Sequence, residues 1–411
     1  MKAEPKRRSK KVTLGDIPHV GRGTPAGEWF RRYWMAVGTT KDLYEIPQAV
    51  KVLGEDLVLF RDEQGRLGLL GLHCSHRGTS LEYGDIECGG IRCPYHGWLY
   101  DVTGQCLEMP AEPKDSKFPQ KVKHLSYPVK EQGGLIFAYM GPGPDNPPPL
   151  PKYSPLIDRG GRRQIEPVRQ CDYNWFNFFE NSADPAHICI LHRHAGYGDQ
   201  TWGDHFFSYR EMPDFNFVET DYGMKVVMTK PGPDPGTEFA DEMSLALPSL
   251  IQVGDTEFVH AKLDAAALMR DGSQCEHILF LTPNDDHHFM IFTVDYYTGP
   301  DHEFFDTLKR MRAKEQPGQE VKEYDRRKYM PFKGNVRQED VMTQSTQGVL
   351  GEREEQLGVS DRGVILFRRI VRDAIAAALK GERPKGVLPE GREEEMIRLD
   401  SFAGVRPKEL F

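Results

Sequence analysis

The sequence predicts an α+β protein of two domains, an all-β domain followed by an antiparallel sheet with helices. Three observations lead to this prediction. Short alternating apolar runs fill residues 49–72, a proline-rich stretch occupies residues 141–151, and longer alternating runs beyond it are flanked by helical segments. At 411 residues the chain is long enough for each domain to have an ample hydrophobic core.

Composition limits the classes of function. Charged residues make up 28% of the chain, and the mean hydropathy is negative. No apolar run reaches the roughly 18 residues of a membrane span and no signal sequence follows Met1, so we expect a cytoplasmic protein without a membrane partner. The net charge of −9 argues against nucleic acid as the main partner.

The first 35 residues are predicted to form a basic arm and a short helix. Lysines and arginines gather between Lys2 and Lys11, which is typical of a solvated terminal segment. A helix is expected within residues 24–34, with Thr24 as its N-cap and Pro25 at its first position.

Residues 36–150 are predicted to form the small β domain. Alternating apolar residues mark strands at Val50–Leu53, Leu57–Arg61 and Leu67–Leu72.

Two loops of this domain each carry one cysteine and one histidine. Cys74 and His76 lie in the first loop, and Cys93 and His96 lie in the second. This order suits a Rieske [2Fe-2S] cluster, in which two thiolates bind one iron and two imidazoles bind the other. A Cys₂His₂ zinc site is the alternative, although zinc fingers place a cysteine pair before a histidine pair.

A second metal site is predicted in the segment that contains Asp184, His187 and His192. Two histidines and a distant carboxylate form the facial triad of non-haem Fe(II) oxygenases, which leaves coordination positions open for O2. Asp184 lies three residues before His187, where its carboxylate could accept the ring N–H that does not face the metal. The alternatives are His194 in place of His192, or an aromatic helix with incidental histidines.

Residues 151–411 are predicted to form the second domain. The proline-rich stretch before it cannot form regular hydrogen-bonded structure and is expected to be a stiff linker. Strands are expected at Leu250–Val253, Glu257–His260, His277–Leu281 and Phe289–Tyr297, and an apolar helix at Val364–Leu379.

The chain resembles the oxygenase α subunit of the Rieske non-haem iron ring-hydroxylating oxygenases, and within them the phthalate dioxygenase group. The resemblance extends from Gly23 to about Gly381. It rests on four motifs: Gly23-Thr-Pro with Arg31-Arg-Tyr-Trp34, Arg92-Cys-Pro-Tyr-His-Gly-Trp98, Tyr100-Asp-Val-Thr-Gly-Gln-Cys106 and Ala138-Tyr-Met-Gly141.

The resemblance implies a site for each metal group. Cys74, His76, Cys93 and His96 would hold the cluster, and His187, His192 and Asp340 would hold the mononuclear Fe(II). Glu339 is the alternative to Asp340. The catalytic domain would have a helix-grip fold with its antiparallel sheet over the iron.

The resemblance also implies the reaction and the partners. A flavin and iron–sulfur reductase would supply electrons, and O2 would be used to hydroxylate a small aromatic substrate. The subunits would form a trimer or hexamer in which Asp184 links the two metal sites across neighbouring subunits.

Two other functions are alternatives. One is O- or N-demethylation by the same metals, and the other is electron transfer without catalysis. Four cations could meet a substrate carboxylate or could equally lie on the surface: Arg193, Lys225, Lys262 and Arg270.

Overall fold

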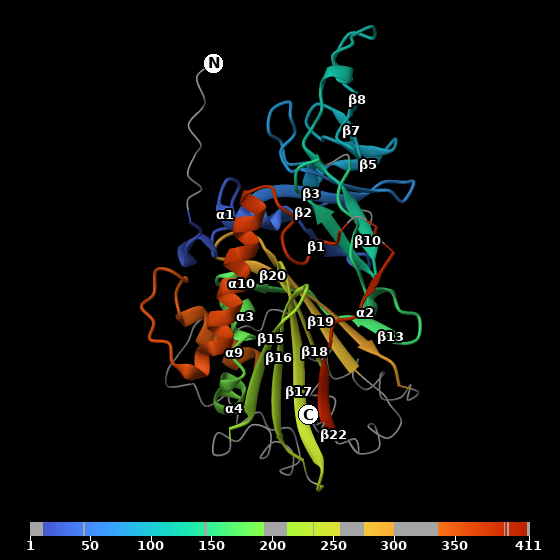
Figure 1. The fold of residues 1–411 in the computed structure, drawn as a ribbon. Helices are drawn as coiled ribbons and strands as arrows, with labels where there is room; N and C mark the ends of the chain where they lie inside the picture. The colour runs from blue at the N-terminus through green and yellow to red at the C-terminus, as the bar shows by residue number, and fades with distance from the viewer. Residues whose placement is uncertain are drawn as a thin grey trace.

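The computed structural model describes residues 11–43, 46–143, 146–192, 212–232, 234–254, 275–299, 336–389, 391–392 and 394–408. A β-rich N-terminal part lies above a large fanned sheet, and helices run along one side of that sheet (Figure 1). In the described part of the chain no helix is long and apolar enough to cross a membrane.

The N-terminal part contains three small antiparallel sheets, as the alternating runs predict. The first has the order β1-β11-β10, the second β2-β3-β4-β9 and the third β5-β6-β7-β8. Their bounds are β1 Trp34–Thr39, β2 Gln48–Val52, β3 Glu55–Arg61, β4 Leu67–Gly71, β5 Asp85–Glu87, β6 Gly90–Arg92, β7 Leu99–Asp101, β8 Cys106–Glu108, β9 Ser126–Tyr127, β10 Val129–Gln132 and β11 Leu135–Tyr139. The predicted strands at residues 50–72 correspond to β2, β3 and β4.

The predicted N-terminal helix is confirmed as α1 (Pro25–Phe30). The Thr24 side chain accepts a hydrogen bond from the Gly27 N–H at 3.1 Å, so it caps the helix as expected. Trp29 and Phe30 are fully buried, and Phe30 packs edge-on against Trp175 at 4.8 Å. The helix therefore belongs to the hydrophobic core that the two parts of the chain share. The basic residues before position 11 lie outside the described part.

The second half is organised around a nine-stranded sheet. Its main path is β13-β20-β19-β18-β17-β16-β15, with β14 beside β20 and β22 beside β17, and these pairings are antiparallel. The bounds are β13 Arg162–Ile165, β14 Arg169–Cys171, β15 Asp214–Glu219, β16 Gly223–Pro231, β17 Thr237–Ala246, β18 Leu250–Gly254, β19 Cys275–Pro283, β20 Phe289–Tyr297 and β22 Phe402–Pro407. Three predicted strands are thereby confirmed, and the fourth, at residues 257–260, lies outside the described residues.

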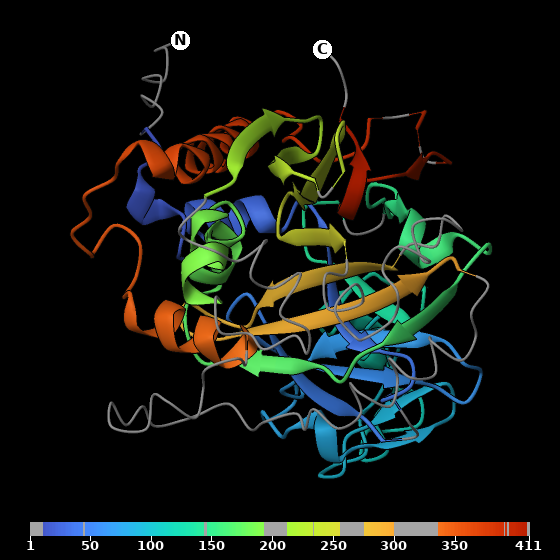
Figure 2. The same cartoon turned by 90° about the horizontal axis from the view of Figure 1, so that it is seen from below.

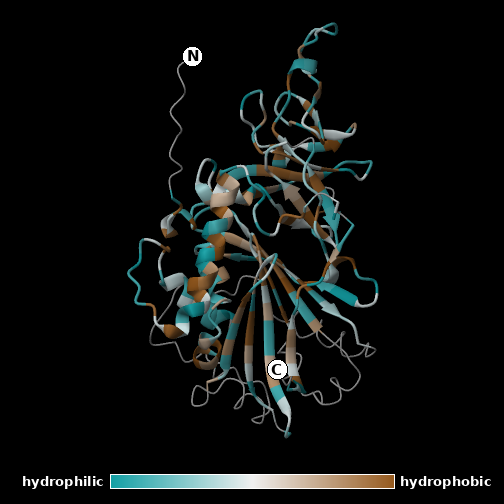
Figure 3. Cartoon of the chain, in the orientation of Figure 1, coloured by the Kyte–Doolittle hydropathy of each residue, from teal (hydrophilic) through white to brown (hydrophobic). Residues whose placement is uncertain are grey.

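The main helices of the second half lie beside this sheet (Figures 1 and 2). They are α3 (Trp175–Asn181), α4 (Ala186–Leu191), α9 (Val336–Thr346) and α10 (Arg362–Leu379). The predicted C-terminal helix is confirmed as α10, two residues longer at its start, and Gly381 with φ +77° follows its end. Hydrophobic residues gather where the sheet strands converge near the centre of the molecule (Figure 3).

The proline-rich connection has neither helix nor strand in its described residues. The Trp34 Nε1–H donates to the Pro148 carbonyl oxygen at 2.7 Å and so fixes the connection to β1. After it come β12 (Lys152–Tyr153), which pairs with β21 (Met396–Ile397), and the short α2 (Ser154–Ile157). The domain boundaries at residues 35 and 150 stay predictions.

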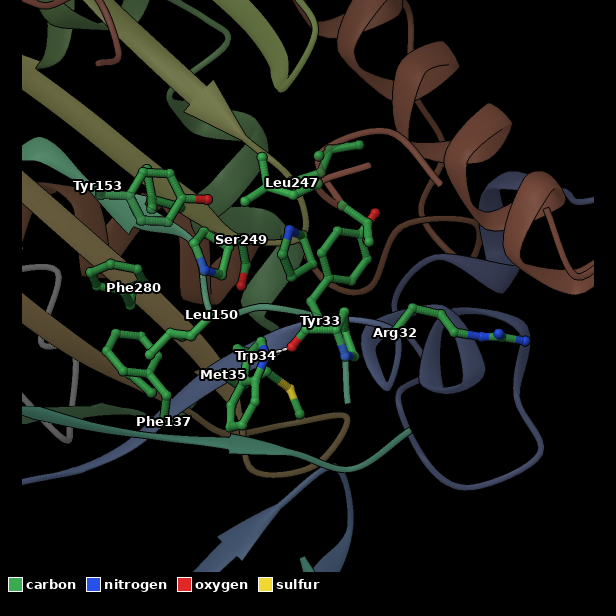
Figure 4. A pocket seen from close by; sticks show the side chains of 18 of the residues that line it. Arg32, Tyr33, Trp34, Met35, Phe137, Leu150, Tyr153, Leu247, Ser249 and Phe280 are labelled. Atoms are coloured by element: carbon green, nitrogen blue, oxygen red, sulfur yellow. Dashed lines mark hydrogen bonds between the residues drawn. The ribbon is translucent and has the colours of Figure 1, made fainter. Parts of the chain in front are cut away.

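A cavity of about 40 Å³ lies at this junction, between Trp34, Phe137, Tyr153 and Phe280 (Figure 4). Small-molecule sites typically have about 300–1,000 Å³. We therefore attribute this cavity to imperfect packing between the two halves.

Candidate functional site

The two Cys-His loops of the N-terminal part have the same backbone hydrogen bonds. In the first loop the Cys74 N–H donates to the Thr79 carbonyl at 2.9 Å, and the Gly78 N–H donates back to the Cys74 carbonyl at 2.9 Å. The second loop repeats both bonds: the Cys93 N–H donates to the Trp98 carbonyl at 2.9 Å, and the Gly97 N–H donates to the Cys93 carbonyl at 3.0 Å. The glycine in each loop has a positive φ, +77° and +73°, which disfavours other residues there.

The four candidate ligands of the cluster lie together at the ends of these loops. Cys74 and Cys93 are 3% and 2% exposed, whereas the His76 side chain is exposed and that of His96 is half-buried. The two imidazole rings are in contact, with centroids 4.5 Å apart, and His76 stacks on Trp98 at 4.5 Å. Two thiols thus face the protein interior and two imidazoles face outward.

Polar groups that the motif alone did not reveal support the first loop. The Tyr100 hydroxyl lies 3.2 Å from Cys74 Sγ, and burial raises the pKa of Tyr100, so this hydroxyl stays protonated. The Ser75 hydroxyl lies 2.7 Å from His124 Nδ1, while His124 Nε2 lies 2.8 Å from the Gly71 carbonyl oxygen. Because that oxygen can only accept, His124 Nε2 carries the proton and Nδ1 accepts from Ser75.

The second set of candidate ligands comes together at the edge of α4 and α9. One ligand atom each from His187, His192 and Asp340 lies within 4.8 Å of the other two. Asp340 Oδ1 is 3.8 Å from His187 Nε2 and 3.4 Å from His192 Nε2. The three groups that the sequence predicts as a triad are therefore neighbours, although Asp340 is far from both histidines in the sequence.

The other ring nitrogen of each histidine has a protein acceptor. His192 Nδ1 lies 2.9 Å from Glu339 Oε2, and His187 Nδ1 contacts the backbone carbonyl oxygen of Asp184. Both rings are thereby held with Nε2 toward Asp340, which is the arrangement that metal-binding histidines require. Glu339 lies on the Nδ1 side, so the geometry favours Asp340 over Glu339 as the ligand.

Asp184 differs from the sequence prediction in one respect. Its carbonyl, not its carboxylate, is the group that meets the His187 ring, and the carboxylate instead accepts from the Ala186 N–H at 3.2 Å. The reason is that Asp184 lies between α3 and α4 and not one turn along a continuous helix. Burial raises the pKa of this carboxyl.

Asn181 is a site residue that the sequence prediction missed. Its side-chain amide lies 3.1 Å from His187 Nε2 and 3.3 Å from Asp340 Oδ1. The amide therefore lies against two of the three candidate ligand atoms. The signal in the sequence was a polar residue at the end of a helix rich in aromatic residues.

A buried ion-pair network fixes the helix that carries Asn181. Arg368 of α10 donates to Glu180 Oε2 at 2.7 Å and to Glu355 at 2.6 and 2.8 Å. Arg353 pairs with the same Glu180 carboxylate. Because Glu180 and Arg368 are about 5% exposed, these pairs are little screened by solvent.

The triad lies on the wall of a cavity of about 250 Å³. The facing wall is one side of the large sheet, with side chains from β14, β17, β18, β19 and β20. Apolar residues of this lining include Phe178, Ile251, Val253 and Leu279. A hydrophobic cavity with a few converging polar groups is typical of a small-molecule site.

Of the four cations predicted to meet a substrate, only Lys225 lies in the described part of the chain. It pairs with Glu242 at 2.6 Å and with Asp400 at 3.3 Å. Glu242 alternates along β17 with the cavity residues Asp241 and Met243, so Lys225 lies on the opposite face of the sheet. Lys225 therefore does not face the cavity, whereas Arg193, Lys262, Arg270 and His194 lie outside the described residues.

Comparison with known proteins agrees with this geometry. The family described as the Rieske [2Fe-2S] domain matches residues 33–127. The α subunit of phenoxybenzoate dioxygenase from Ectopseudomonas oleovorans is 35% identical over 384 residues, which cover 90% of this chain and 86% of that protein. The chain belongs to the Rieske ring-hydroxylating oxygenase α subunits.

Other Rieske oxygenases similar to the chain catalyse different reactions. The oxygenase subunit of 5,5'-dehydrodivanillate O-demethylase from Sphingobium sp. is 30% identical, over 94% of this chain and 85% of that protein. The phthalate 4,5-dioxygenase oxygenase subunit of Pseudomonas putida is 29% identical, over 94% of this chain and 90% of that protein. Dicamba monooxygenase bound to dicamba has a similar fold, with a TM-score of 0.63 and 18% identity. The match covers 86% of this chain and 99% of that one.

The Rieske oxygenase fold is therefore as the sequence predicts, with an N-terminal Rieske β domain and a catalytic domain of a large antiparallel sheet and helices. The two buried thiols and two touching imidazoles fit the Rieske cluster. At the second site, two oriented imidazoles and one carboxylate fit a mononuclear non-haem iron.

Proposed function

We propose that the protein is a terminal oxygenase in which Cys74, His76, Cys93 and His96 hold the Rieske cluster and His187, His192 and Asp340 hold the mononuclear iron. The observation that carries the proposal is the convergence of two Nε2 atoms and one carboxylate oxygen on the wall of a 250 Å³ cavity. When bound, the cluster supplies single electrons and the mononuclear iron supplies oxygen activation.

The protein's own groups orient the ligands and the substrate. Glu339 and the Asp184 carbonyl fix the ring nitrogens of the two histidines, and the Asn181 amide lies against the ligand atoms. The apolar wall of the sheet excludes water from the substrate and keeps the aromatic ring near the triad.

The proposed route for electrons between the sites uses Asp184. Its carboxylate does not bind the His187 ring in the single chain, which leaves it available to an imidazole of a neighbouring copy. We propose a ring of subunits, a trimer or a hexamer, in which Asp184 meets the His96 of the adjacent copy.

The proposed reaction is hydroxylation of an aromatic substrate with electrons from a flavin and iron–sulfur reductase. The relatives that act as dioxygenases support it. O- or N-demethylation is the second candidate, because the dehydrodivanillate relative is an O-demethylase. A pure electron-transfer protein would not need the converging triad or the cavity beside it.

Metal content and turnover test the proposal. The purified chain should contain about three irons and two acid-labile sulfides, and its reduced form should give a Rieske-type electron paramagnetic resonance signal. With NADH alone it should be inactive, and adding a surrogate reductase should allow oxygen-dependent hydroxylation of a member of a panel of aromatic acids. Zinc in place of iron, or turnover with NADH and no second protein, would contradict the proposal.

A further inference from the structure

The wall of the 250 Å³ cavity carries charged side chains that the proposed oxygen chemistry does not use. Arg169, Glu166, Asp241, His277 and Arg337 line the same cavity as the triad. Charged groups in such a cavity either pair with one another or remain available to a ligand. The distances between their side-chain atoms show which groups are paired.

Most of the charges on this wall are already in pairs. Arg337 lies 3.1 Å from Glu166, whose side chain is 3% exposed. His277 Nδ1 lies 2.6 Å from Asp295 Oδ1, and the Asp295 side chain is 2% exposed. These buried carboxylates therefore have cationic or imidazole partners within the protein.

Arg169 is the exception among the described cationic residues of this wall. No hydrogen bond or ion pair joins its side chain to another described residue, and its Nε is buried without an acceptor. Its position is fixed, because β14 pairs with β20 and places Arg169 opposite Ile291. A buried N–H group without an acceptor calls for an explanation, and a bound anion provides one.

We propose that Arg169 binds the carboxylate of the substrate and that the protein selects aromatic monocarboxylates. The inference rests on the proposed function, since it concerns the cavity beside the iron site. Guanidinium and carboxylate groups form short, charge-assisted hydrogen bonds with a defined relative orientation. Such a contact would hold the ring against the apolar part of the wall, with one edge toward the triad.

The preference for one carboxylate follows from the remaining charges. A second carboxylate on the same ring would lie in a cavity that also contains Glu166 and Asp241, while Arg337 is already paired with Glu166. Burial raises the pKa of Asp241 to about 7, and the neighbouring Glu242 carboxylate adds to the shift. Around neutral pH, part of the Asp241 population is therefore ionised and repels a dianion.

Binding can be measured apart from catalysis. Calorimetric titration of the holoprotein without reductase would use benzoate, the neutral benzamide and the dianion phthalate. The variants are Arg169→Gln, Arg169→Lys and, as a matched control, Lys225→Gln on the other face of the same sheet. The absorption spectrum of the cluster reports whether each variant is folded and loaded.

We expect wild-type protein to bind benzoate about tenfold or more tightly than benzamide or phthalate. Benzamide has no charge to pair with Arg169, and the second carboxylate of phthalate is repelled by the acidic side chains of the cavity. Arg169→Gln should abolish the preference for benzoate and leave benzamide binding nearly unchanged. Arg169→Lys should keep part of the preference, and Lys225→Gln should keep all of it.

Three results would overturn the inference: benzamide or phthalate binding to wild-type protein as tightly as benzoate, no benzoate binding at all, or unchanged benzoate affinity in folded Arg169→Gln. The wild-type comparison decides the matter even if that variant does not fold. Failure of the proposed function looks different, since benzoate would bind through Arg169 while no oxygen-dependent product formed with a reductase. Conversely, if the protein hydroxylates a neutral aromatic compound but does not bind benzoate, carboxylate binding by Arg169 is rejected and the proposed oxygenase function stands.

Discussion

The two candidate metal regions differ in how the chain builds them. The four residues of the cluster site lie in two loops that have the same backbone hydrogen bonds. Cys74 and His76 lie in the first loop, and Cys93 and His96 lie in the second. The triad instead combines His187 and His192 with Asp340, which another helix brings from far along the chain. The first site is therefore set by local loop geometry, whereas the second depends on packing between α3, α4, α9 and α10.

This difference predicts that the second region is more sensitive to distant changes. Residues far from the triad, such as Arg368, should affect it, while the cluster should respond mainly to groups in its own loops.

Asp184→Ala tests the link between the two regions and should give the largest loss of activity among the three variants that follow. Loss of a group that supports metal-bound imidazoles typically reduces activity about 10–100-fold. Since the Asp184 carbonyl and not its carboxylate holds the His187 ring, the variant should keep its mononuclear iron and a reducible cluster. Stopped-flow absorption should show slow reoxidation of the reduced cluster by oxygen in the presence of substrate.

Cluster reoxidation at the wild-type rate in Asp184→Ala, with product still formed, would remove Asp184 from the proposed route. Asp172→Ala, an exposed carboxylate just before α3, is a suitable control and should reoxidise normally.

Arg368→Ala should destabilise the second region selectively. Removing one partner from a buried ion pair typically costs about 3–5 kcal/mol, and we expect a loss at the lower end of this range because Arg353 still pairs with Glu180 and Glu355. The Glu180 and Glu355 carboxylates would both lose this partner, and α3 would be held less firmly. Chemical denaturation followed by tryptophan fluorescence should show the loss, together with weaker retention of the mononuclear iron.

The adjacent Arg369 provides the matched control for Arg368. Its side chain is 50% exposed and pairs with Glu219, so Arg369→Ala should change the free energy of unfolding by less than about 1 kcal/mol. Equal effects of the two variants would contradict the role given to the buried network. Loss of the Rieske absorption spectrum in Arg368→Ala would contradict the claim that the cluster depends mainly on groups in its own loops.

Tyr100→Phe should have the smallest effect and should be confined to the first region. A hydrogen bond from the Tyr100 hydroxyl to the Cys74 sulfur favours the more negative, reduced cluster. At about 1 kcal/mol for this bond, its loss should lower the reduction potential by about 40 mV, since 1.4 kcal/mol corresponds to about 59 mV for one electron. Spectroelectrochemical titration measures the shift, and an unchanged or higher potential would contradict the assigned contact.

The sequence predicted the first region more completely than the second for a physical reason. The Cys-x-His and Cys-x-x-His spacings encode the loops locally, so all four residues could be identified from the motif. Asp340 gave no such local signal, because a single carboxylate near a helix start has many ordinary roles. Only the resemblance to a family indicated it, and only the packing of α9 placed it beside the histidines.

The contacts around the two regions were the least predictable part. Neither the Asn181 amide nor the orientation of Glu339 toward His192 Nδ1 follows from spacing along the chain. The Asp184 carboxylate was expected on the His187 ring, and the break between α3 and α4 replaced it with the carbonyl. The face on which Lys225 lies depended on strand register, which a one-residue shift would reverse.

Iron content of Asp340→Ala beside Glu339→Ala tests the central assignment most directly. Each purified variant would be analysed for iron and acid-labile sulfide per chain and for the Rieske electron paramagnetic resonance signal. Asp340→Ala should retain about two irons, two sulfides and the full cluster signal, having lost only the mononuclear iron. Glu339→Ala should retain about three irons as isolated and release the third more readily to a chelator, because it only orients His192. A third iron that persists in Asp340→Ala and is absent from Glu339→Ala would contradict the assigned triad.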